Sequence, residues 1–356
     1  MIPRVVHVAS GREWRGGQRQ VWLLARALAR HGSVEQAVLT GRGSELARRL
    51  DADGVPTLTP VWTGAFDLRA FLATLRASSR GTILHAHDSH ALSMAGMASS
   101  LRGSRLVATR RVDVPFGRNG FWRRADRVIA VSTAVGEALS AGGIRPERIS
   151  VVPSGIAIGE TAAVVPHDPR PELGLAAGTP LVITTGALVA VKDHATMVRA
   201  AAAARSHLPD LHWAIAGEGY LRGTLESLIA ELGVGDRVHL LGHVPEAARL
   251  VACADLFAMS STWEGLGTSL LDAMVLGVPV VGTRVGGIPE LLGEDAGRLV
   301  PPRDPEAMAS AVVSLLGDPA GRAAYAARAR TVVERYSDER MAEGVFRVYR
   351  SLTSAH

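Results

Sequence analysis

The chain has 356 residues, which is more than one ordinary hydrophobic core holds and enough for two domains. Hydrophobic residues make up 47% and charged residues 21%, a composition typical of soluble globular proteins. The net charge of +5 favours an acidic partner such as nucleotide phosphates, anionic lipid or nucleic acid. The single cysteine, Cys253, excludes an internal disulfide and a cysteine metal site.

The first residues, MIPRVVHVAS, run directly into a β-branched segment and lack the long apolar core of a signal peptide. No later run approaches the roughly 20 apolar residues that a membrane-spanning helix needs. We therefore expect a cytoplasmic protein, either free or peripheral on the inner face of the cell membrane.

The first half of the chain alternates short β-branched runs with helical patterns. In QVWLLARALARHG, apolar residues recur every three or four positions and Gly32 ends the predicted helix. Repeated strand–helix–strand units predict a parallel sheet covered by helices. The predicted strands of this half are residues 4–10, 34–40, 82–87, 105–110, 127–132 and 149–155.

A proline-rich segment with little periodicity, residues 161–180, is interpreted as a linker between domains 1–160 and 181–336. Strand patterns then resume at residues 180–186, 211–219, 237–242, 254–261 and 277–283. Two such halves predict an α/β protein with two doubly wound, Rossmann-like domains facing across a cleft, and ligands at the carboxyl ends of the strands. The last segment, residues 337–356, has one apolar helical face and is predicted to be a closing helix.

A glycine turn follows the first predicted strand, where ASGREWRGGQRQV places Gly16 and Gly17 before a helix. The spacing is not G-x-G-x-x-G, so a nicotinamide enzyme is disfavoured. The two glycines could form a plain turn, but the neighbouring arginines favour a phosphate or acidic ligand.

A histidine cluster, LHAHDSHA, lies at the end of the strand predicted over 82–87. Alternate residues of a strand share a face, so His85 and His87 could converge, and histidine is a common metal ligand. No acidic or cysteine pattern accompanies them, so we favour a packed or cleft-lining pair over a metal site.

In the second half, TTGALVAVKDH follows a strand and places Lys192 at the start of the next helix. A lysine at this position can reach a phosphate as a point charge. The alternative is a solvated helix lysine, which is less satisfactory because Lys192 is the only lysine in the chain.

The strongest local signal is the stretch STWEGLGTSLLDAMVLGVPVV, a glycine-rich turn followed by an apolar helix and a buried strand. A helix start exposes unpaired backbone N–H groups, and glycines let a ligand approach them, so this turn predicts an anion site. The alternative is that Ser269 caps the helix and forms a capping box with Asp272. That alternative leaves Glu264 and the glycines unexplained.

The stretch EGLGTSLLDAMVLGVPVV, followed by GGIPELL, resembles the signature of GT-B glycosyltransferases of family 4. Further family motifs occur in the same order along nearly the whole chain: GG, HAH, VIAVSTAV, VVPSGI, GALVAVKDH, AIAGEG, LLGHV and YSDERMAE. The resemblance implies a GT-B fold. Residues 1–160 would bind the acceptor, 181–336 the nucleotide sugar, and the helix at 337–356 would return to the N-terminal domain.

The resemblance also implies a retaining glycosyltransferase that moves a sugar from a nucleotide diphosphate sugar to a cell-envelope glycan or glycolipid. It implies neither a cofactor nor an essential metal. The implied partners are the donor and the acceptor, with an anionic membrane surface as a further candidate and no nucleic acid.

By matching positions, the resemblance assigns Glu264 to the donor sugar, Asp272 to the ribose and Lys192 to the diphosphate. Glu264 and Lys192 are the implied catalytic residues. Arg111, which departs from the family pattern, is our further catalytic candidate, and we expect His85, His87 and Arg110 to line the acceptor side or the cleft. The remaining implied donor-binding residues are Gly16, Gly17, Gly186, Gly217, Glu218, Gly242, His243, Val244, Gly265, Leu266, Gly267, Thr268 and Ser269.

Three positions depart from the usual family pattern. Asp272 stands where the family usually has glutamate, and Ala187 stands where its G-R-L-x-x-x-K motif has arginine. In ATRRVD, Arg110 and Arg111 occupy the place of a frequent T-x-H step. We expect one of these arginines to supply the charge that Ala187 lacks, the alternative being a weakened or non-catalytic site.

Two other functions fit the same architecture. A nucleotide-sugar 2-epimerase would need acid–base groups at the second carbon of the sugar. A non-catalytic sugar-nucleotide binding module would fit the loss of the usual cation at Ala187.

A separate stretch, RNGFWRRADR (118–127), mixes aromatic residues with arginines. It predicts either an interfacial membrane patch or a helix that packs its aromatics inward.

Overall fold

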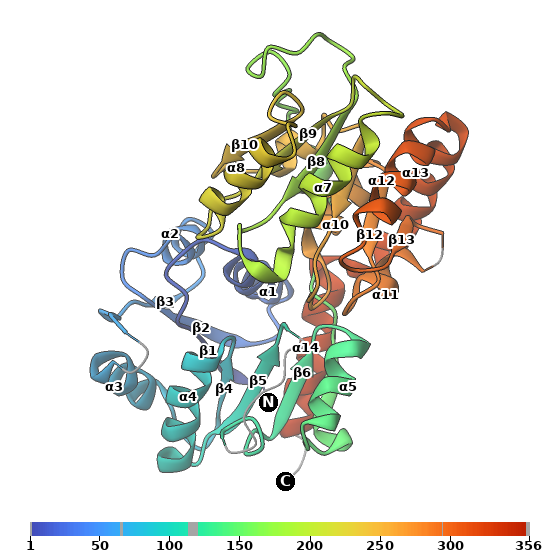
Figure 1. Ribbon diagram of the computed structural model, residues 1–356. Coiled ribbons are helices and arrows are strands. Elements are labelled where there is room, and N and C mark those ends of the chain that lie inside the picture. Colours follow the sequence, from blue (N-terminus) through green and yellow to red (C-terminus); the bar gives the residue numbers. More distant parts are fainter. Residues whose placement is uncertain (1, 65–66, 113–119, 294, 354–356) are drawn as a thin grey trace. The chain divides into compact units, whose positions relative to one another are not determined.

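The computed structural model describes residues 2–64, 67–112, 120–293 and 295–353, which form two compact units (Figure 1). Unit 1 comprises Met1–Gly155 together with Tyr336–His356, and unit 2 comprises Ile156–Arg335. Each unit has its own parallel sheet, so the predicted architecture of two doubly wound α/β units is confirmed.

Unit 1 contains a seven-stranded sheet in the order β3-β2-β1-β4-β5-β6-β7. The order reverses between β1 and β4, which pair in parallel with His7 opposite His85. Ligands of open α/β sheets bind at such reversals, outside the carboxyl ends of the strands. The strands are β1 (Arg4–Ala9), β2 (Glu35–Thr40), β3 (Thr57–Leu58), β4 (Thr82–Ala86), β5 (Arg105–Arg110), β6 (Arg127–Ala130) and β7 (Ile149–Val151).

The helices of unit 1 cover both faces of this sheet. The first and last helices, α1 and α14, pack together on one face, and α3 and α4 pack on the other (Figure 1). Side chains of Ser44, Asp67, Asp88 and Ser132 cap four of the helices by accepting backbone N–H groups. The helices are α1 (Gly16–His31), α2 (Glu45–Ala52), α3 (Leu68–Ala77), α4 (Ser89–Arg102), α5 (Thr133–Ala141), the short η1 (Pro146–Arg148) and α14 (Asp338–Thr353).

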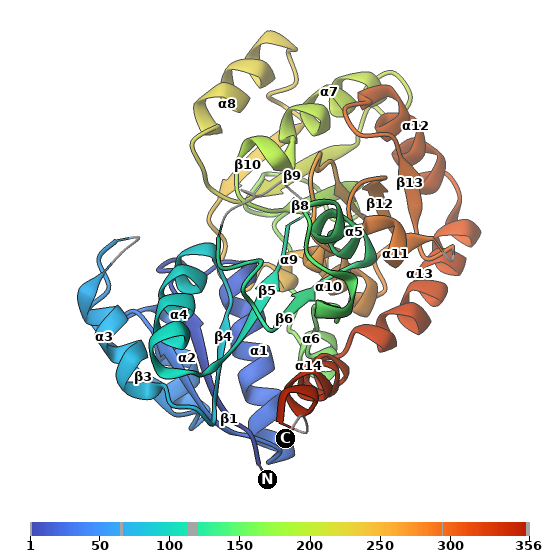
Figure 2. The ribbon, with the colours of Figure 1, turned by 90° about the horizontal axis from the view of Figure 1, so that it is seen from below.

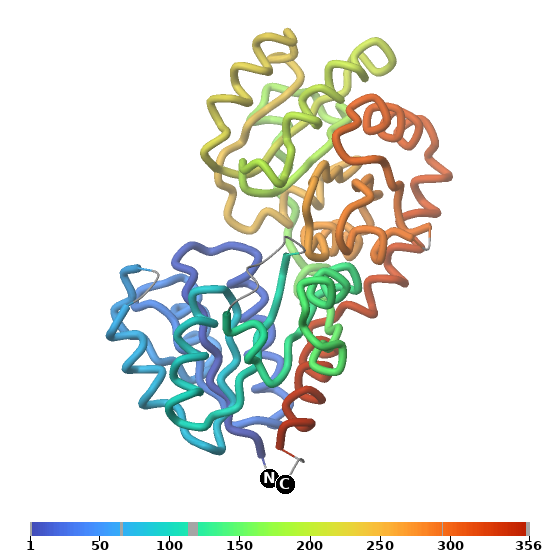
Figure 3. The backbone as a smooth tube through the Cα atoms, turned by 60° about the horizontal axis from the view of Figure 1, so that its bottom comes forward, coloured from blue at the N-terminus to red at the C-terminus, as the bar shows by residue number. Residues whose placement is uncertain are grey.

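The C-terminal helix α14 belongs to unit 1, although about 180 residues of unit 2 precede it in the chain. Figure 3 traces this return of the red C-terminal segment to the blue and green unit. The periodicity predicts an apolar face of Met341, Val345, Phe346 and Tyr349, and all of these are buried except Phe346, which is half-buried.

Unit 2 contains a six-stranded parallel sheet in the order β10-β9-β8-β11-β12-β13, which reverses between β8 and β11. The two short edge strands β3 and β13 were not predicted, because runs of two and three residues carry too little pattern. The strands are β8 (Leu181–Thr185), β9 (His212–Ala216), β10 (Val238–Gly242), β11 (Leu256–Met259), β12 (Val280–Thr283) and β13 (Arg298–Val300).

The helices of unit 2 surround a core centred on Trp213, which is 1% exposed. Asp-Pro pairs start α12 and α13, with Asp304 and Asp318 as caps, and α13 follows α12 in the orange-red segment (Figure 2). The helices are α6 (Ile158–Ala162), η2 (Ala190–Lys192), α7 (His194–Ala204), α8 (Arg222–Glu231), α9 (Ala248–Val251), α10 (Thr268–Leu276), α11 (Ile288–Leu292), α12 (Pro305–Leu316) and α13 (Pro319–Val333). The short η3 (Glu334–Tyr336) contains the residue at which the chain passes back to unit 1.

The segment 161–180, interpreted from sequence as a linker, belongs to unit 2 in the structure. Arg170 anchors this segment, because it is 7% exposed and donates to Asp255 at 2.7 Å and to the carbonyl of Cys253 at 3.1 Å. A buried arginine held by a carboxylate fixes the segment to the residues directly before β11. Among the described residues, no helix is both long enough and apolar enough to cross a membrane.

Candidate functional site

The predicted donor-binding residues of unit 2 lie at the carboxyl ends of four adjacent strands, β10, β9, β8 and β11, in the turns that follow them, or in the first two turns of α10. Parallel strands end at the same edge of a sheet, so these turns meet although their residues are far apart in the chain. The sheet order reverses between β8 and β11, and the turns after these two strands are the ones that carry Lys192 and Glu264.

Three of the turns interlock through glycine. Gly186 N donates to the carbonyl of Ala216 at 3.0 Å, and Gly217 N donates to that of Gly242 at 2.7 Å. A Cβ at Gly217 would lie 1.8 Å from the carbonyl oxygen of Gly186, so no side chain fits there. Beside them Glu218 is ion-paired with Arg222 at 2.7 Å, and the next two predicted residues are the exposed His243 and the half-buried Val244.

Lys192 and Glu264 form an ion pair across the reversal between β8 and β11, and both side chains are mostly buried. Ser261 donates to the same Glu264 oxygen at 3.3 Å. The two turns are joined further by Ser260, whose hydroxyl lies within hydrogen-bonding distance of the carbonyls of Lys192 and Asp193. The only lysine of the chain is therefore held beside the glutamate at the edge of the sheet, and is not a solvated helix lysine.

Helix α10 begins directly beyond this ion pair. Its N-cap is Gly267, with φ of 90°, a left-handed conformation that favours glycine. The preceding Gly265 and Leu266 are buried, while Thr268 and Ser269 in the first turn are half-buried. The N–H groups of the first turn, which have no hydrogen-bond acceptor within the helix, therefore follow closely after Glu264.

The capping-box alternative for Ser269 and Asp272 does not fit this helix. A capping box needs the serine at the N-cap position, whereas Ser269 is the second residue of α10 and Gly267 is the cap. Asp272 lies in the second turn and is 7% exposed.

His194 is the first residue of α7 and lies two residues after Lys192. It is not among the residues selected from the sequence. It is 4% exposed, and its Nε2 lies 3.3 Å from the carbonyl of Ala187. Burial lowers the pKa of His194 from 6.5 to about 4, so its ring is neutral at pH 7. It does not replace the cation that is missing at Ala187. His194 is the last residue of the motif KDH, but nothing in the spacing of that motif indicated a functional histidine.

In unit 1, the reversal between β1 and β4 is joined by a hydrogen bond that sequence reasoning also missed. The Ser10 amide donates to Asp88 at 2.7 Å and the Ser10 hydroxyl donates to it at 2.5 Å, while Asp88 also caps α4.

The predicted Gly16 and Gly17 are the first two residues of α1, and no atom outside the adjoining backbone lies within 4 Å of a Cβ built at Gly17.

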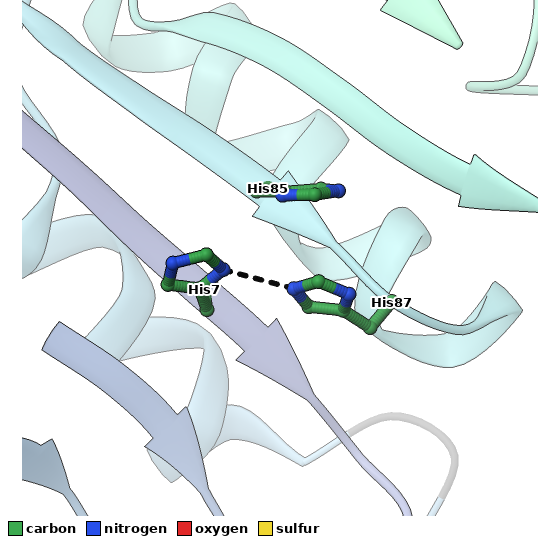
Figure 4. Close-up of side chains that lie close together, drawn as sticks. All are labelled: His7, His85 and His87. Carbon is green, nitrogen blue, oxygen red and sulfur yellow. Dashed lines mark hydrogen bonds between the residues drawn. The ribbon is translucent and has the colours of Figure 1, made fainter. Parts of the chain in front are cut away.

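His85 and His87 do converge, and the fold adds a third histidine, His7 (Figure 4). All three are buried, and one ring nitrogen of each lies within 4.8 Å of the others. Each ring already has partners: His7 contacts His87 at 3.0 Å, and His85 contacts Tyr349 and Thr109, each at 2.6 Å. The single sequence run LHAHDSHA could not reveal His7, which comes from β1.

The two arginines after β5 have different surroundings. Arg110 is 8% exposed, donates to the carbonyl of Val112 at 3.0 Å and lies over the ring of Trp122. Arg111 donates to the carbonyl of His87 at 3.1 Å and contacts the Nδ1 atom of that ring at 3.4 Å. Burial lowers the pKa of Arg111 from 12.5 to about 10, opposed by the nearby Asp88 carboxylate, so Arg111 remains a cation at pH 7.

Part of the aromatic–arginine stretch packs inward. The ring of Phe121 lies against Gly96 of α4, where a Cβ would come within 2.2 Å of it. Arg123 and Arg124 are exposed, and Arg118 lies outside the described residues. For Phe121 the structure therefore agrees with the packing alternative.

Two parallel sheets, each with its polar turns at a point of strand reversal, define a class of two-unit α/β proteins that bind ligands at the carboxyl ends of strands. Residues 14–160 match the family described as Glycosyltransferase Family 4, and residues 179–318 match that described as Glycosyl transferases group 1. The chain belongs to the group 1, family 4 glycosyltransferases, and it has the GT-B fold, as the motifs predict.

Similar proteins agree with this assignment. The lipopolysaccharide core biosynthesis glycosyltransferase LpsE of Rhizobium meliloti is 28% identical over 355 residues, which is 98% of this chain and 99% of that protein. The MMP alpha-(1->4)-mannosyltransferase of Mycolicibacterium hassiacum is 28% identical over 316 residues, 78% of this chain and 73% of that protein. Anabaena Alr3699/HepE, solved in complex with UDP-glucose, has the same fold, with a TM-score of 0.84, 21% identity and 99% of each chain covered.

Proposed function

We propose that this glycosyltransferase transfers a sugar, with retention at the anomeric carbon, from a nucleotide diphosphate sugar to a cell-envelope glycan or glycolipid. The observation that carries the proposal is the Lys192–Glu264 ion pair at the strand reversal of unit 2, directly before α10. The name of LpsE, a lipopolysaccharide core glycosyltransferase, supports the class of acceptor.

The chemistry of the site fits a diphosphate leaving group. Negative charge builds on the phosphate as the sugar–oxygen bond breaks, and fixed donors aimed at that charge lower the barrier. Lys192 supplies a cation, and the backbone of residues 266–269 supplies N–H groups at a helix start. Glu264 accepts hydrogen bonds from the sugar, and Asp272 from the ribose.

In this proposal the catalytic charges come from the chain, and no divalent metal is needed. Arg111 of unit 1 supplies the second cation, because Ala187 replaces the arginine that usually accompanies the lysine. The open space beside Gly17 leaves room for a phosphate at the start of α1.

The proposal includes a peripheral contact with anionic membrane through the exposed Arg123 and Arg124. We expect the chain to sediment with anionic vesicles at low salt, and a variant with Arg118, Arg123 and Arg124 changed to glutamine to lose this binding. Equal binding by the variant, or none by either protein, would contradict the membrane contact.

The donor is tested with a panel of nucleoside diphosphates and nucleotide sugars, including UDP-glucose and GDP-mannose, in thermal unfolding. A ligand that binds only the folded state raises its stability. Turnover of the stabilising donor, as transfer or slow hydrolysis, should persist in excess EDTA, and NMR of the product should show the donor's own anomeric configuration.

Three results would change the assignment. Epimer interconversion without transfer would favour the 2-epimerase, and binding without any turnover would favour a binding module. Activity that disappears in EDTA and returns with magnesium or manganese would contradict the metal-independent mechanism.

A further inference from the structure

A series of hydrogen bonds, buried at its centre and partly buried at both ends, runs through unit 1 from α1 to Arg111. Gln36 Nε2 donates to the carbonyl of Ala25 at 2.6 Å, and Gln36 Oε1 lies 3.1 Å from Nε2 of His7. His7 Nδ1 lies 3.0 Å from Nε2 of His87 (Figure 4). The Nδ1 atom of His87 faces the Arg111 guanidinium at 3.4 Å.

The first link of this series fixes the direction of the others. The carbonyl of Ala25 can only accept, so the Gln36 amide nitrogen faces it and the amide oxygen faces His7. That oxygen can also only accept, so His7 carries its proton on Nε2.

A neutral imidazole has one donor and one acceptor nitrogen, so a proton on Nε2 leaves His7 Nδ1 as an acceptor. His87 must then donate from its Nε2, which leaves the lone pair of His87 on Nδ1. This lone pair points at Arg111, which can only donate, and Arg111 also donates to the carbonyl of His87 at 3.1 Å. Each hydrogen bond between Ala25 and Arg111 in this series therefore has one donor and one acceptor in a single arrangement of protons.

We propose that Gln36, His7 and His87 are positioning residues, which fix the tautomer of His87 so that its Nδ1 and carbonyl hold the Arg111 guanidinium at the carboxyl edge of the unit 1 sheet. The inference rests on the role given to Arg111 in the proposed function, and it deepens that role. A planar guanidinium with two acceptors from one residue is held in orientation as well as in place.

Burial keeps both histidines in the neutral form that this arrangement needs. His7 is fully buried and His87 is 6% exposed. Burial lowers the pKa of His7 to about 4 and holds that of His87 well below its usual value. A protonated His87 would direct an N–H group at the Arg111 cation.

The same arrangement argues against a metal ion at His7, His85 and His87. A metal bound to Nε2 of His87 would displace its proton to Nδ1, where the hydrogen would face the N–H groups of Arg111. His85 is also committed, to Tyr349 and Thr109, at 2.6 Å each. His7 and His87 are thus explained by the hydrogen bonds that lead to Arg111, and His85 by its hydrogen bonds to Tyr349 and Thr109.

The tautomers are tested in the unmodified protein by NMR of ¹⁵N-labelled histidine, with His7→Phe and His87→Phe used to assign the signals. Both His7 and His87 should carry the proton on Nε2 at pH 7. A proton on Nδ1 of either residue would overturn the proposal. The proposal would also be overturned if the wild type retained one equivalent of zinc after dialysis and His7→Phe did not.

The effect on Arg111 is tested by a double-mutant cycle, with hydrolysis of UDP-glucose or GDP-mannose, whichever stabilises the protein more, as the readout. We expect Arg111→Ala and His7→Phe each to reduce kcat by about tenfold or more. In the Arg111→Ala background, His7→Phe should change kcat by less than about twofold, because the positioned group is already absent. His7→Asn, which keeps an acceptor near Nδ1, should retain more activity than His7→Phe.

The matched control is Tyr349→Phe, which removes a buried hydrogen bond from His85 and none of the hydrogen bonds that lead to Arg111. It should lower the melting temperature as His7→Phe does, yet keep wild-type kcat. Full activity in His7→Phe beside a loss in Arg111→Ala would overturn the positioning alone. Full activity in Arg111→Ala would overturn the role of Arg111 in the proposed function as well.

Discussion

At the scale of single residues, Asp272 shows how a helix boundary changes the interpretation of a side chain. The sequence allowed Asp272 to be part of a capping box, but the cap of α10 is Gly267 and the aspartate is buried in the second turn. Its proposed role is therefore to accept hydrogen bonds from the ribose of the donor.

We expect Asp272→Asn, which keeps the shape of the side chain, to bind a nucleoside diphosphate at least about tenfold more weakly. A hydrogen bond to a charged group contributes about 1.5–3 kcal/mol, or roughly 10- to 150-fold in affinity. Asp272→Glu should bind nearly as the wild type does. Calorimetric titration measures both, and normal affinity in Asp272→Asn with a lower melting temperature would show a structural role only.

The Lys192–Glu264 ion pair gives a second prediction at this scale. Before the donor binds, Glu264 neutralises the lysine that the diphosphate needs. Glu264→Gln should therefore bind the free nucleoside diphosphate at least as tightly as the wild type and still lose turnover, whereas Lys192→Ala should lose both. Titration calorimetry and donor hydrolysis separate these outcomes, and weaker nucleotide binding in Glu264→Gln would contradict the proposed competition.

At the scale of elements, the donor site depends on turns that pass each other closely at the ends of β8, β9 and β10. A Cβ at Gly217 would lie 1.8 Å from the Gly186 oxygen, and one at Gly219 would lie 2.3 Å from the Leu188 oxygen. Backbone atoms cannot move aside as a flexible side chain can, so these glycines determine how the turns fit together.

Gly217→Ala should therefore destabilise unit 2 by about 1–3 kcal/mol or more and weaken nucleotide binding. The control is Gly223→Ala in the first turn of α8, where no atom lies within 4 Å of the new Cβ. That change should be neutral or stabilise the protein by up to about 1 kcal/mol, because alanine favours helix more than glycine does. Urea unfolding compares the two, and equal stability would show that the turn can rearrange.

At the scale of the whole molecule, each unit contains buried neutral histidines that make stability depend on pH. The pKa of His7 in unit 1 and that of His194 in unit 2 are both lowered by burial to about 4, against roughly 6.5 in an unfolded chain. Between these values the unfolded chain binds more protons than the folded one, so acid favours unfolding.

We expect the free energy of unfolding to be highest above about pH 6.5 and to fall steadily toward pH 4, by on the order of 3 kcal/mol per histidine. Urea unfolding at pH 7.5, 6 and 5 tests this, with each unit followed separately if two transitions appear. His194→Gln should flatten the pH dependence of unit 2 and leave that of unit 1 unchanged. Equal stability at pH 5 and 7.5 would contradict the prediction.

Many elements follow from local pattern. The strand at 82–87 and the helix that ends at Gly32 are recognisable because their side chains alternate or recur with the period of the structure they form. The short β3 and β13 are not, because their two or three residues become strands only when a neighbouring strand is present. The same reason explains the segment 161–180, whose fixed position depends on a distant partner of Arg170, Asp255.

The sequence by itself determined the two α/β units, the family, and the turn that carries Glu264, because these are written in contiguous residues and in the order of motifs. Only the tertiary structure decided that Lys192 pairs with Glu264, that Ser10 binds Asp88, and that His7 joins His87. Each of these contacts joins residues at least 72 positions apart. The order of strands in the sheet brings them together, and no local periodicity encodes which strands become neighbours.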